Sequence, residues 1–274
     1  MGSEWITVNG HSMHVQRTGE PSLPVIVFLH GFTGSLDTWN TIVSLMEGKA
    51  HTVAIDLWGH GRSDKPETSS DYSMEKQTRD LEQLFQQLEL QSFILVGYSM
   101  GGRTALGYAT SYPERIQRLV LESASPGLKT EAERFERRQR DAKLADRLLE
   151  EPFEEFVDFW ESLALFDSQK SMSAEQIEAV RKERLNQDPK GLANSLMGIG
   201  TGSQPSYWNV LSDQLYPVDL ITGSLDSKFE NIALEMKNLF PNVSHFSVEN
   251  AGHAIHVEKP EEFATIIDGI VKQK

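Results

Sequence analysis

The chain has 274 residues, of which 39% are hydrophobic and 9% aromatic, and its formal net charge is −14. This composition is typical of a globular protein, and the acidic balance argues against nucleic acid or an anionic membrane surface as a partner. Cysteine is absent, which excludes disulfides and thiol catalysis and fits a cytoplasmic location. The start of the chain shows no secretory signal, and no apolar run is long enough to span a membrane.

Eight strand-like segments occur along the chain, and several are continuous β-branched runs typical of strands buried on both faces. They are residues 5–8, 12–17, 25–29, 51–56, 93–97, 118–122, 218–222 and 244–248. Helix-compatible segments lie at 37–46, 74–88, 102–112, 228–239 and 260–272. This alternation predicts a mostly parallel, doubly wound α/β sheet, and Asn9-Gly10 predicts an antiparallel hairpin at its start.

Residues 125–215 break the alternation. Helical patterns follow one another there, at about 130–150, 152–165, 174–187 and 189–199, without a strand between them. We interpret this stretch as a helical lid inserted into an α/β core formed by residues 1–124 and 216–274. Open α/β sheets bind ligands at the C-terminal ends of their strands, so the lid would cover the site.

The most informative motif is Gly97-Tyr98-Ser99-Met100-Gly101, which has the pattern G-x-S-x-G. It follows an apolar strand and precedes a helix-compatible stretch. This context predicts a sharp strand-to-helix turn that exposes the Ser99 hydroxyl at a helix N-terminus. Such a serine can act as a nucleophile or a proton acceptor, provided that a base lies beside it.

The base and its orienting acid are expected later in the chain. His253 lies in a glycine-containing loop before the last helix, and His256 is its rival. Asp226 follows a strand and a glycine turn, whereas the rival acid, Glu122, ends an earlier strand. The order serine, aspartate, histidine favours Ser99, Asp226 and His253 as a catalytic triad.

Two backbone N–H groups are expected to form an oxyanion hole. One belongs to Met100, directly after the serine, and the other to Phe32, in the loop His30-Gly31-Phe32. His30 is expected to brace that loop. We interpret the glycine-containing loop 56–63 as structural; the alternative is that it lines the site. No cluster of histidine and carboxylate residues has the spacing of a metal site.

Arginine is concentrated in the predicted lid, which holds seven of the thirteen arginines. Arg103 follows Ser99 by one helical turn, so its guanidinium can stay near the site. Arginine binds carboxylates in a bidentate manner, which indicates a substrate with several carboxylates. The alternative is a solvated helix with Glu133–Arg137 and Glu136–Arg140 pairs, and we expect it to hold for about half of the lid arginines.

Together these motifs resemble the α/β-hydrolase superfamily over essentially the whole chain, a superfamily with many functions. A narrower resemblance is to the 2-succinyl-6-hydroxy-2,4-cyclohexadiene-1-carboxylate synthases of menaquinone biosynthesis. The segments that carry it are Tyr98–Arg103, Pro126-Gly127-Leu128 with Glu133-Arg134 and Arg137, Glu151-Pro152 with Trp160, Arg184-Leu185-Asn186, and Asp226-Ser227-Lys228-Phe229.

This resemblance implies a lyase that eliminates pyruvate from an enolpyruvyl cyclohexene dicarboxylate without any cofactor. It implies that Arg103, Arg137 and Arg184 bind substrate carboxylates, and that Tyr98 and Trp160 line the pocket. Arg134, Arg138 or Arg181 could replace a neighbouring lid arginine. An esterase or C–C-bond hydrolase with a covalent Ser99, and a non-catalytic ligand-binding protein, remain the alternatives. The sequence predicts no oligomeric state.

Overall fold

The computed structural model describes residues 2–273. One eight-stranded sheet has the order β1-β2-β4-β3-β5-β6-β7-β8. Its strands are β1 (Gly2–Val8), β2 (His11–Thr18), β3 (Val25–Leu29), β4 (His51–Ile55), β5 (Phe93–Tyr98), β6 (Ile116–Glu122), β7 (Val218–Gly223) and β8 (Val243–Val248). Each of the predicted strand segments forms a strand.

The first two strands form the antiparallel part of the sheet. β1 pairs with β2 and β2 with β4 in antiparallel register, and every later pair is parallel. Asn9 and Gly10 connect β1 to β2 with positive φ angles of 48° and 84°, as a two-residue hairpin turn requires. The predicted doubly wound sheet with an antiparallel start is therefore confirmed.

Helices cover both faces of the sheet. One face carries α1 (Asn40–Leu45), α9 (Ile255–Glu258) and α10 (Pro260–Lys272), and the other carries α2 (Met74–Gln87), α3 (Met100–Ser111) and α8 (Ser227–Lys237). β5 shows why its apolar run is continuous. Phe93 and Leu95 pack on the α2 and α3 side, and Ile94 and Val96 pack on the α1 and α10 side. A strand buried on both faces needs apolar residues at every position.

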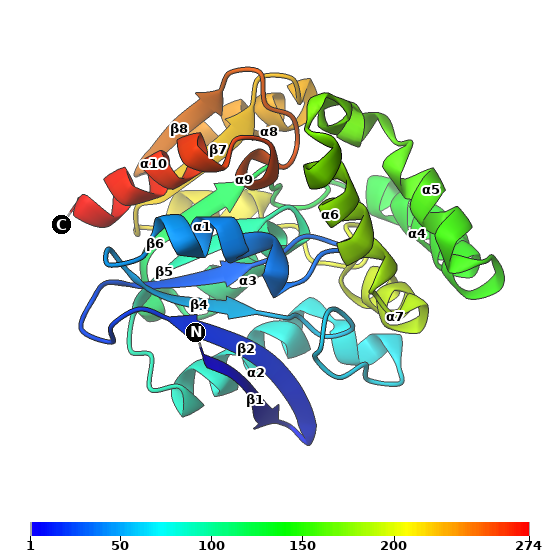
Figure 1. The fold of residues 1–274 in the computed structure, drawn as a ribbon, viewed down its shortest axis with the longest axis horizontal. Coiled ribbons are helices and arrows are strands. Elements are labelled where there is room, and N and C mark those ends of the chain that lie inside the picture. The colour runs from blue at the N-terminus through cyan, green and yellow to red at the C-terminus, as the bar shows by residue number, and fades with distance from the viewer. Residues whose placement is uncertain (1, 274) are drawn as a thin grey trace.

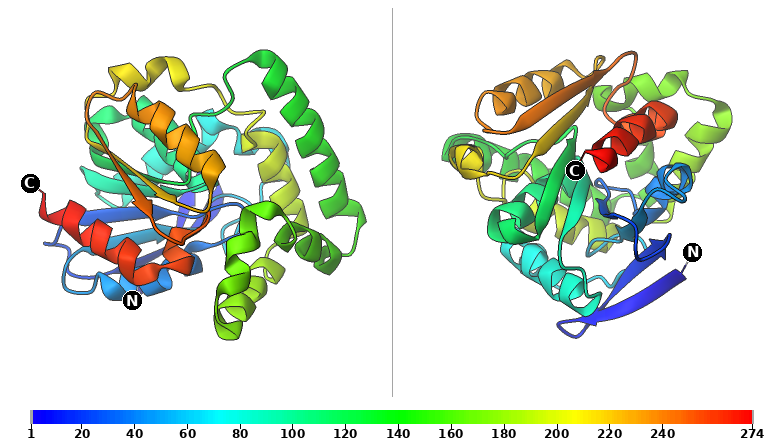
Figure 2. Two further views of the ribbon diagram at one scale, coloured as in Figure 1. Left: turned by 90° about the horizontal axis from the view of Figure 1, so that it is seen from above. Right: turned by 90° about the vertical axis from the view of Figure 1, so that its left-hand side faces the viewer.

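Four further helices lie between β6 and β7 in the chain: α4 (Glu131–Glu150), α5 (Phe153–Glu161), α6 (Ala174–Leu185) and α7 (Pro189–Ile199). Figures 1 and 2 show them grouped at one end of the sheet, apart from the helices on its faces. They share an apolar cluster of their own, which includes Leu148, Phe156 and Leu192. Short 3₁₀ turns complete the fold: η1 (Leu36–Trp39), η2 (Ser69–Tyr72), η3 (Pro113–Arg115), η4 (Ala164–Ser171) and η5 (Trp208–Asp213).

One predicted ion pair in α4 is absent. Glu133 does not bind Arg137; its carboxylate accepts from the Thr130 backbone N–H and closes a capping box at the start of α4. Arg137 pairs with Asp141 instead, at 2.7 Å. Glu136 and Arg140 do pair, at 3.5 Å. Capping satisfies backbone donors at the helix end, and this use of Glu133 takes precedence over a solvent-exposed ion pair.

No helix within residues 2–273 is long and apolar enough to cross a membrane.

Candidate active site

The site forms where the chain reverses its direction of travel across the sheet. From β3 the chain passes to β4 on one side and then returns to β5 on the other side of β3. The loops after β3 and β5 therefore diverge and leave a crevice between them, which is the usual ligand position in such sheets. Phe32 follows β3, and Ser99 follows β5.

Ser99 occupies a strained turn between β5 and α3. Its φ is 51° and its ψ is −106°, a conformation that non-glycine residues rarely adopt. The flanking glycines are required by close backbone contacts. A Cβ atom on Gly97 would lie 2.4 Å from the carbonyl oxygen of Gly101, and one on Gly101 would lie 2.2 Å from that of Leu29. The packing around these two glycines thus holds the serine in position.

Ser99, His253 and Asp226 form a continuous hydrogen-bonded set. His253 Nε2 lies 3.0 Å from Ser99 Oγ, and His253 Nδ1 lies 2.7 Å from Asp226 Oδ2. His253 is 1% exposed. The other oxygen of Asp226 accepts from the Phe229 backbone N–H at 3.2 Å, because Asp226 is the N-cap of α8. This geometry lets His253 take the serine proton while Asp226 orients the ring.

The two rival residues bind each other instead. His256 Nδ1 lies 2.9 Å from Glu122 Oε1, and His256 Nε2 lies 2.9 Å from Thr38 Oγ1. Both Glu122 and His256 are completely or almost completely buried. Neither side chain is hydrogen-bonded to the side chain of Ser99 or of His253 among the contacts of residues 2–273; Glu122 meets the serine only through its backbone carbonyl oxygen, which accepts from the Ser99 N–H at 2.9 Å. The structure therefore favours Asp226 over Glu122 as the partner of His253.

The two expected oxyanion donors lie on opposite sides of the crevice. Met100 is the first residue of α3, and Phe32 lies in the loop after β3; both line the cavity that contains Ser99. A Cβ atom on Gly31 would lie 2.5 Å from the Tyr98 ring, so glycine permits this loop to approach the residue before the serine. His30 braces the loop as expected: its Nε2 accepts from the Leu57 N–H at 3.0 Å.

The cavity next to Ser99 has a volume of about 190 Å³. The core and the helices between β6 and β7 both contribute to its wall. Tyr98 and Trp160 line it, as do Arg103 and Arg137, whereas no residue of the loop 56–63 does. Four of the five side chains expected to contact substrate thus face one enclosed space beside the serine.

Arg103 is the most enclosed cation of this cavity, with 9% of its surface exposed. Its guanidinium donates to the Ile199 carbonyl oxygen at 2.7 Å and to Gln204 Oε1. Burial and the neighbouring Arg137 lower the pKa of Arg103 to about 10, so it stays charged at neutral pH. No carboxylate among residues 2–273 forms an ion pair with Arg103 in the structure, so its charge is available to an anionic ligand.

Arg184 lies outside this cavity. It lines a smaller neighbouring cavity that shares Phe32, Tyr98 and Phe166 with the first. Its guanidinium binds Glu161 at 3.1 Å and Gln169 at 3.2 Å, and it lies 4.6 Å from the centre of the Phe166 ring. Arg184 is therefore separated from the Ser99 cavity by aromatic side chains in this conformation.

The remaining lid arginines pair with acids near the surface. Arg134 and Arg138 bind Glu131, Arg147 binds Glu151, and Arg181 binds three acids of α5. None of these four lines the Ser99 cavity. Together with Arg140, five of the seven arginines of residues 125–215 pair with acids near the surface, away from the Ser99 cavity, which is more than the expected half.

Lys228 is a cavity residue that belongs to one of the sequence motifs but that the sequence analysis did not name as a site residue. It lines the Ser99 cavity at the start of α8, two residues after Asp226. Desolvation and the neighbouring Arg137 lower its pKa, and Asp226 opposes this shift. The sequence signal that could have identified Lys228 was its position in the first helical turn after Asp226. Arg103, Arg137 and Lys228 give the cavity a cationic wall.

Comparison with known proteins agrees with this geometry. A family model described as the α/β-hydrolase fold matches residues 24–260. The chain belongs to the α/β-hydrolase family. A Bacillus subtilis protein that carries the name 2-succinyl-6-hydroxy-2,4-cyclohexadiene-1-carboxylate synthase provisionally is 44% identical over 97% of both chains. The synthase of that name from Salmonella agona is 31% identical over 96% of this chain and 97% of its own.

Solved structures show the same relationship. The structure of MenH from S. aureus has a TM-score of 0.89 and 37% sequence identity, and the match covers 94% of this chain and 98% of that one. The match includes both the α/β core and most of the helical part, since almost the whole chain is covered. The predicted α/β-hydrolase fold is confirmed by these comparisons.

Proposed function

We propose that this protein is a lyase that eliminates pyruvate from 2-succinyl-5-enolpyruvyl-6-hydroxy-3-cyclohexene-1-carboxylate in menaquinone biosynthesis. The product is 2-succinyl-6-hydroxy-2,4-cyclohexadiene-1-carboxylate. Relatives that carry the name of this synthase and align over nearly the whole chain support the proposal. The observation that carries it is a hydrogen-bonded Ser99, His253 and Asp226 set that opens into a cavity lined by Arg103 and Arg137.

The cationic cavity wall accounts for the choice of substrate. The substrate carries carboxylates on its succinyl, ring and enolpyruvyl groups. Arg103 and Arg137 can bind carboxylates, and Lys228 adds a third positive charge. Arg184 can join them if its contact with Glu161 exchanges for a substrate carboxylate. Tyr98 and Trp160 supply apolar ring faces beside the cyclohexene.

The chemical step is removal of a carbon-bound proton. Ser99 Oγ transfers its own proton to His253 Nε2 and takes a proton from the ring carbon. The C2–H electron pair forms the C2=C3 bond, and the existing C3=C4 pair shifts to C4=C5. The C5–O bond to the enolpyruvyl group then breaks, and its electron pair leaves on the pyruvate enolate. The Phe32 and Met100 N–H groups stabilise the developing oxyanion. Proton uptake at carbon then gives pyruvate, and no redox or metal step is involved.

Residues 125–215 act as a lid in this proposal. Trp160 and Arg137 belong to this segment and line the cavity together with Ser99 of the core. A closed lid excludes water, which strengthens the electrostatic contacts and makes the serine oxyanion a stronger base. We infer that the ligand is a small polycarboxylate. We also infer that the reaction takes place in the cytoplasm, a location with which the absence of cysteine is compatible.

The test is to supply the enolpyruvyl intermediate and to measure pyruvate with a coupled NADH assay. We expect release by the wild-type chain and none by Ser99→Ala. Intact-protein mass spectrometry during turnover should show no added mass on the protein. Deuterium at the abstracted position should slow the step where chemistry limits the rate.

A Ser99 ester formed from this substrate would reject proton abstraction in favour of nucleophilic hydrolysis. Absence of pyruvate, together with hydrolysis of simple esters, would place the chain among the esterases. Tight binding of the intermediate without turnover would support a ligand-binding protein instead.

A further inference from the structure

The loop that carries the Phe32 N–H group is attached to the core at both of its ends. At its start, His30 Nδ1 donates to the Gly31 carbonyl oxygen at 2.8 Å, and His30 Nε2 accepts from Leu57 N–H at 3.0 Å. These two bonds require a neutral imidazole, and burial lowers the pKa of His30 accordingly. At its end, the Leu36 N–H donates to Asp56 Oδ1 at 2.7 Å.

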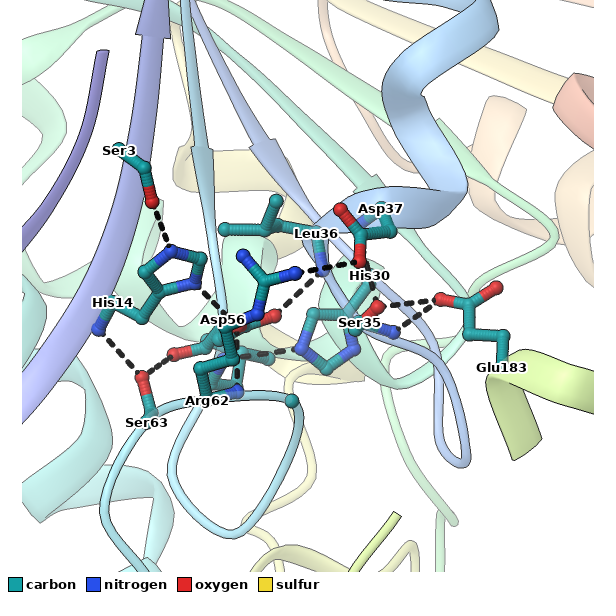
Figure 3. Close-up of polar contacts among 12 residues, drawn as sticks. Ser3, His14, His30, Ser35, Leu36, Asp37, Asp56, Arg62, Ser63 and Glu183 are labelled. Carbon is teal, nitrogen blue, oxygen red and sulfur yellow. Dashed lines mark hydrogen bonds and ion pairs between the residues drawn. The ribbon is translucent and has the colours of Figure 1, made fainter. Parts of the chain in front are cut away.

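Asp56 makes the core side of this attachment rigid. Its other carboxylate oxygen accepts from the Arg62 N–H at 2.8 Å and lies 2.7 Å from His14 Nδ1. The Ser63 hydroxyl donates to the Asp56 carbonyl oxygen at 2.6 Å. Figure 3 shows His14, Arg62 and Ser63 gathered around Asp56, next to Leu36. The buried network satisfies its polar groups and fixes one end of the loop.

A third attachment comes from the lid. Glu183, near the end of α6, accepts through one carboxylate oxygen from both the Ser35 backbone N–H and the Ser35 hydroxyl, each at 2.7 Å. Figure 3 shows Glu183 reaching the loop from a helix separate from all the other residues drawn. Four residues further on, Gln187 Oε1 accepts from the Gly61 N–H at 2.9 Å. The end of α6 is therefore hydrogen-bonded to both core loops.

The turn between Phe32 and Ser35 is short and closed. The Gly34 N–H donates to the Gly31 carbonyl oxygen at 3.2 Å, and Thr33 has a φ of 66°. Because the turn is short and closed by a hydrogen bond, a displacement of Ser35 also displaces Phe32. The Phe32 ring also packs against Trp160 of α5, with 5.3 Å between centroids. Two contacts from the lid thus act on the residue that supplies an oxyanion donor.

The Glu183 contact can open without damage to the core. It lies beside a groove of about 760 Å³ between η1, the loop 56–62 and α6. Water from this groove can bind the Ser35 donors when α6 moves away, so neither donor is left unpaired. The hydrogen bonds between Glu183 and Ser35 can therefore break and re-form, whereas those of the buried Asp56 network stay in place.

We propose that Glu183 is a positioning residue that couples the seating of lid helix α6 to the placement of the Phe32 oxyanion donor. The donor is then aligned only when α6 is seated on the loop. Glu183 itself does not touch the reacting atoms. The link to turnover depends on the function proposed above, whereas the link between α6 and the loop depends only on the contacts of Glu183 and Gln187.

The test compares Glu183→Ala, Glu183→Gln and a matched control, Glu178→Ala, which alters an exposed residue of the same helix. Steady-state pyruvate release is measured for each. We expect Glu183→Ala to lower kcat about tenfold or more, since loss of a whole oxyanion donor costs roughly 10²–10³-fold. KM should change less than about threefold, because Arg103 and Arg137 come from α3 and α4.

Glu183→Gln keeps an oxygen acceptor for Ser35 and should recover most of kcat, and Glu178→Ala should match the wild type. Equal losses in the alanine and glutamine variants, or a change confined to KM, would overturn the positioning role. Thermal unfolding of each variant identifies any that fails to fold.

Amide hydrogen exchange of residues 30–36, measured by mass spectrometry without substrate, separates this proposal from the proposed function. Exchange at this segment should rise in Glu183→Ala and not in Glu178→Ala. Unchanged exchange would overturn the coupling even if pyruvate is released. If the wild type releases no pyruvate, the proposed reaction fails, and the exchange result alone decides whether α6 restrains the loop.

Discussion

Asp226 and Glu122 differ in what they bind, although both lie at the C-terminal side of a buried strand of the same sheet: Glu122 ends β6, and Asp226 follows β7. Asp226 contacts the histidine that contacts Ser99, and Glu122 contacts a histidine that contacts Thr38. Both are buried carboxylates, so residue type and burial alone do not show which of them orients the base. The hydrogen-bond partner of each carboxylate decides which one can orient the base.

We expect Asp226→Asn to lower turnover roughly 10³-fold or more, since the imidazole then loses the carboxylate that orients it. Glu122→Gln should keep turnover within about tenfold and lower the thermal stability, because it disturbs a buried pair. Pyruvate release and thermal unfolding of the two variants check this. If Glu122→Gln lost turnover while Asp226→Asn stayed active, the acid that orients the base would be Glu122 and not Asp226.

The arginines are likewise distinguished by their individual contacts. Arg103→Ala should lower kcat/KM on the order of 10²-fold, because a charge-assisted contact to a carboxylate contributes roughly 1.5–3 kcal/mol. Arg140 is 73% exposed and pairs only with an exposed glutamate at 3.5 Å, so Arg140→Ala should leave kcat/KM within about twofold. Similar small effects of both substitutions would mean that Arg103 does not bind substrate.

The strand-to-helix turn is the element that most constrains the sequence. Gly97 and Gly101 cannot carry a side chain without overlap with backbone atoms, and these contacts hold β3, β5 and α3 together at Ser99. The G-x-S-x-G pattern thus predicts the whole strand-to-helix turn and not only the catalytic role of Ser99. Because the glycines and the serine are all local to the turn, its sequence alone is enough to predict it.

Gly101→Ala should destabilise the fold by about 1–3 kcal/mol or more and abolish activity, because the new methyl group would lie 2.2 Å from the Leu29 carbonyl oxygen. Gly269→Ala is the matched control in α10, where nothing lies within 4 Å of the added atom. It should stabilise the fold by about 0.5–1 kcal/mol through helix propensity. Urea unfolding and pyruvate release measure both variants, and a stable, active Gly101→Ala would contradict the packing argument.

Elements with a strong local signal were predictable, and contacts between elements were not. The apolar run of β5 and the hairpin at Asn9-Gly10 follow from local patterns. Arg137 pairs with Asp141 because the capping box of α4 engages Glu133, a local Thr130–Glu133 pattern that the sequence interpretation overlooked. The contacts of Arg184 and Glu183 depend on how α6 docks on the core, which no spacing in the chain specifies.

Across the molecule as a whole, the helices between β6 and β7 are joined to the rest of the structure by contacts of mixed kind. The sheet has two apolar cores, one on each face, and the helices between β6 and β7 have a third. Polar contacts such as those of Glu183 and Gln187 connect this third cluster to the core loops. In the proposed role as a lid, this third cluster would move as a unit, and these polar contacts and the packing of Phe32 on Trp160 would open with it.

The global stability should depend on a buried histidine beneath the site loops. His60 is fully buried, and burial together with the neighbouring His30 lowers its pKa to about 3. In the unfolded chain it titrates near 6.5. The unfolded state therefore binds the proton first as pH falls, and the stabilisation present above pH 6.5 is lost progressively between pH 6.5 and pH 3.

His60→Asn removes this titration, and its effect isolates His60 from the other groups that titrate on acidification. Between pH 7 and pH 5 the wild type should lose about 2 kcal/mol more stability than the variant, measured by urea unfolding at each pH. His11→Asn is the control, since it makes the same substitution at a histidine whose side chain is 45% exposed. An identical decline in His60→Asn and wild type would show that His60 is not held neutral in the folded state.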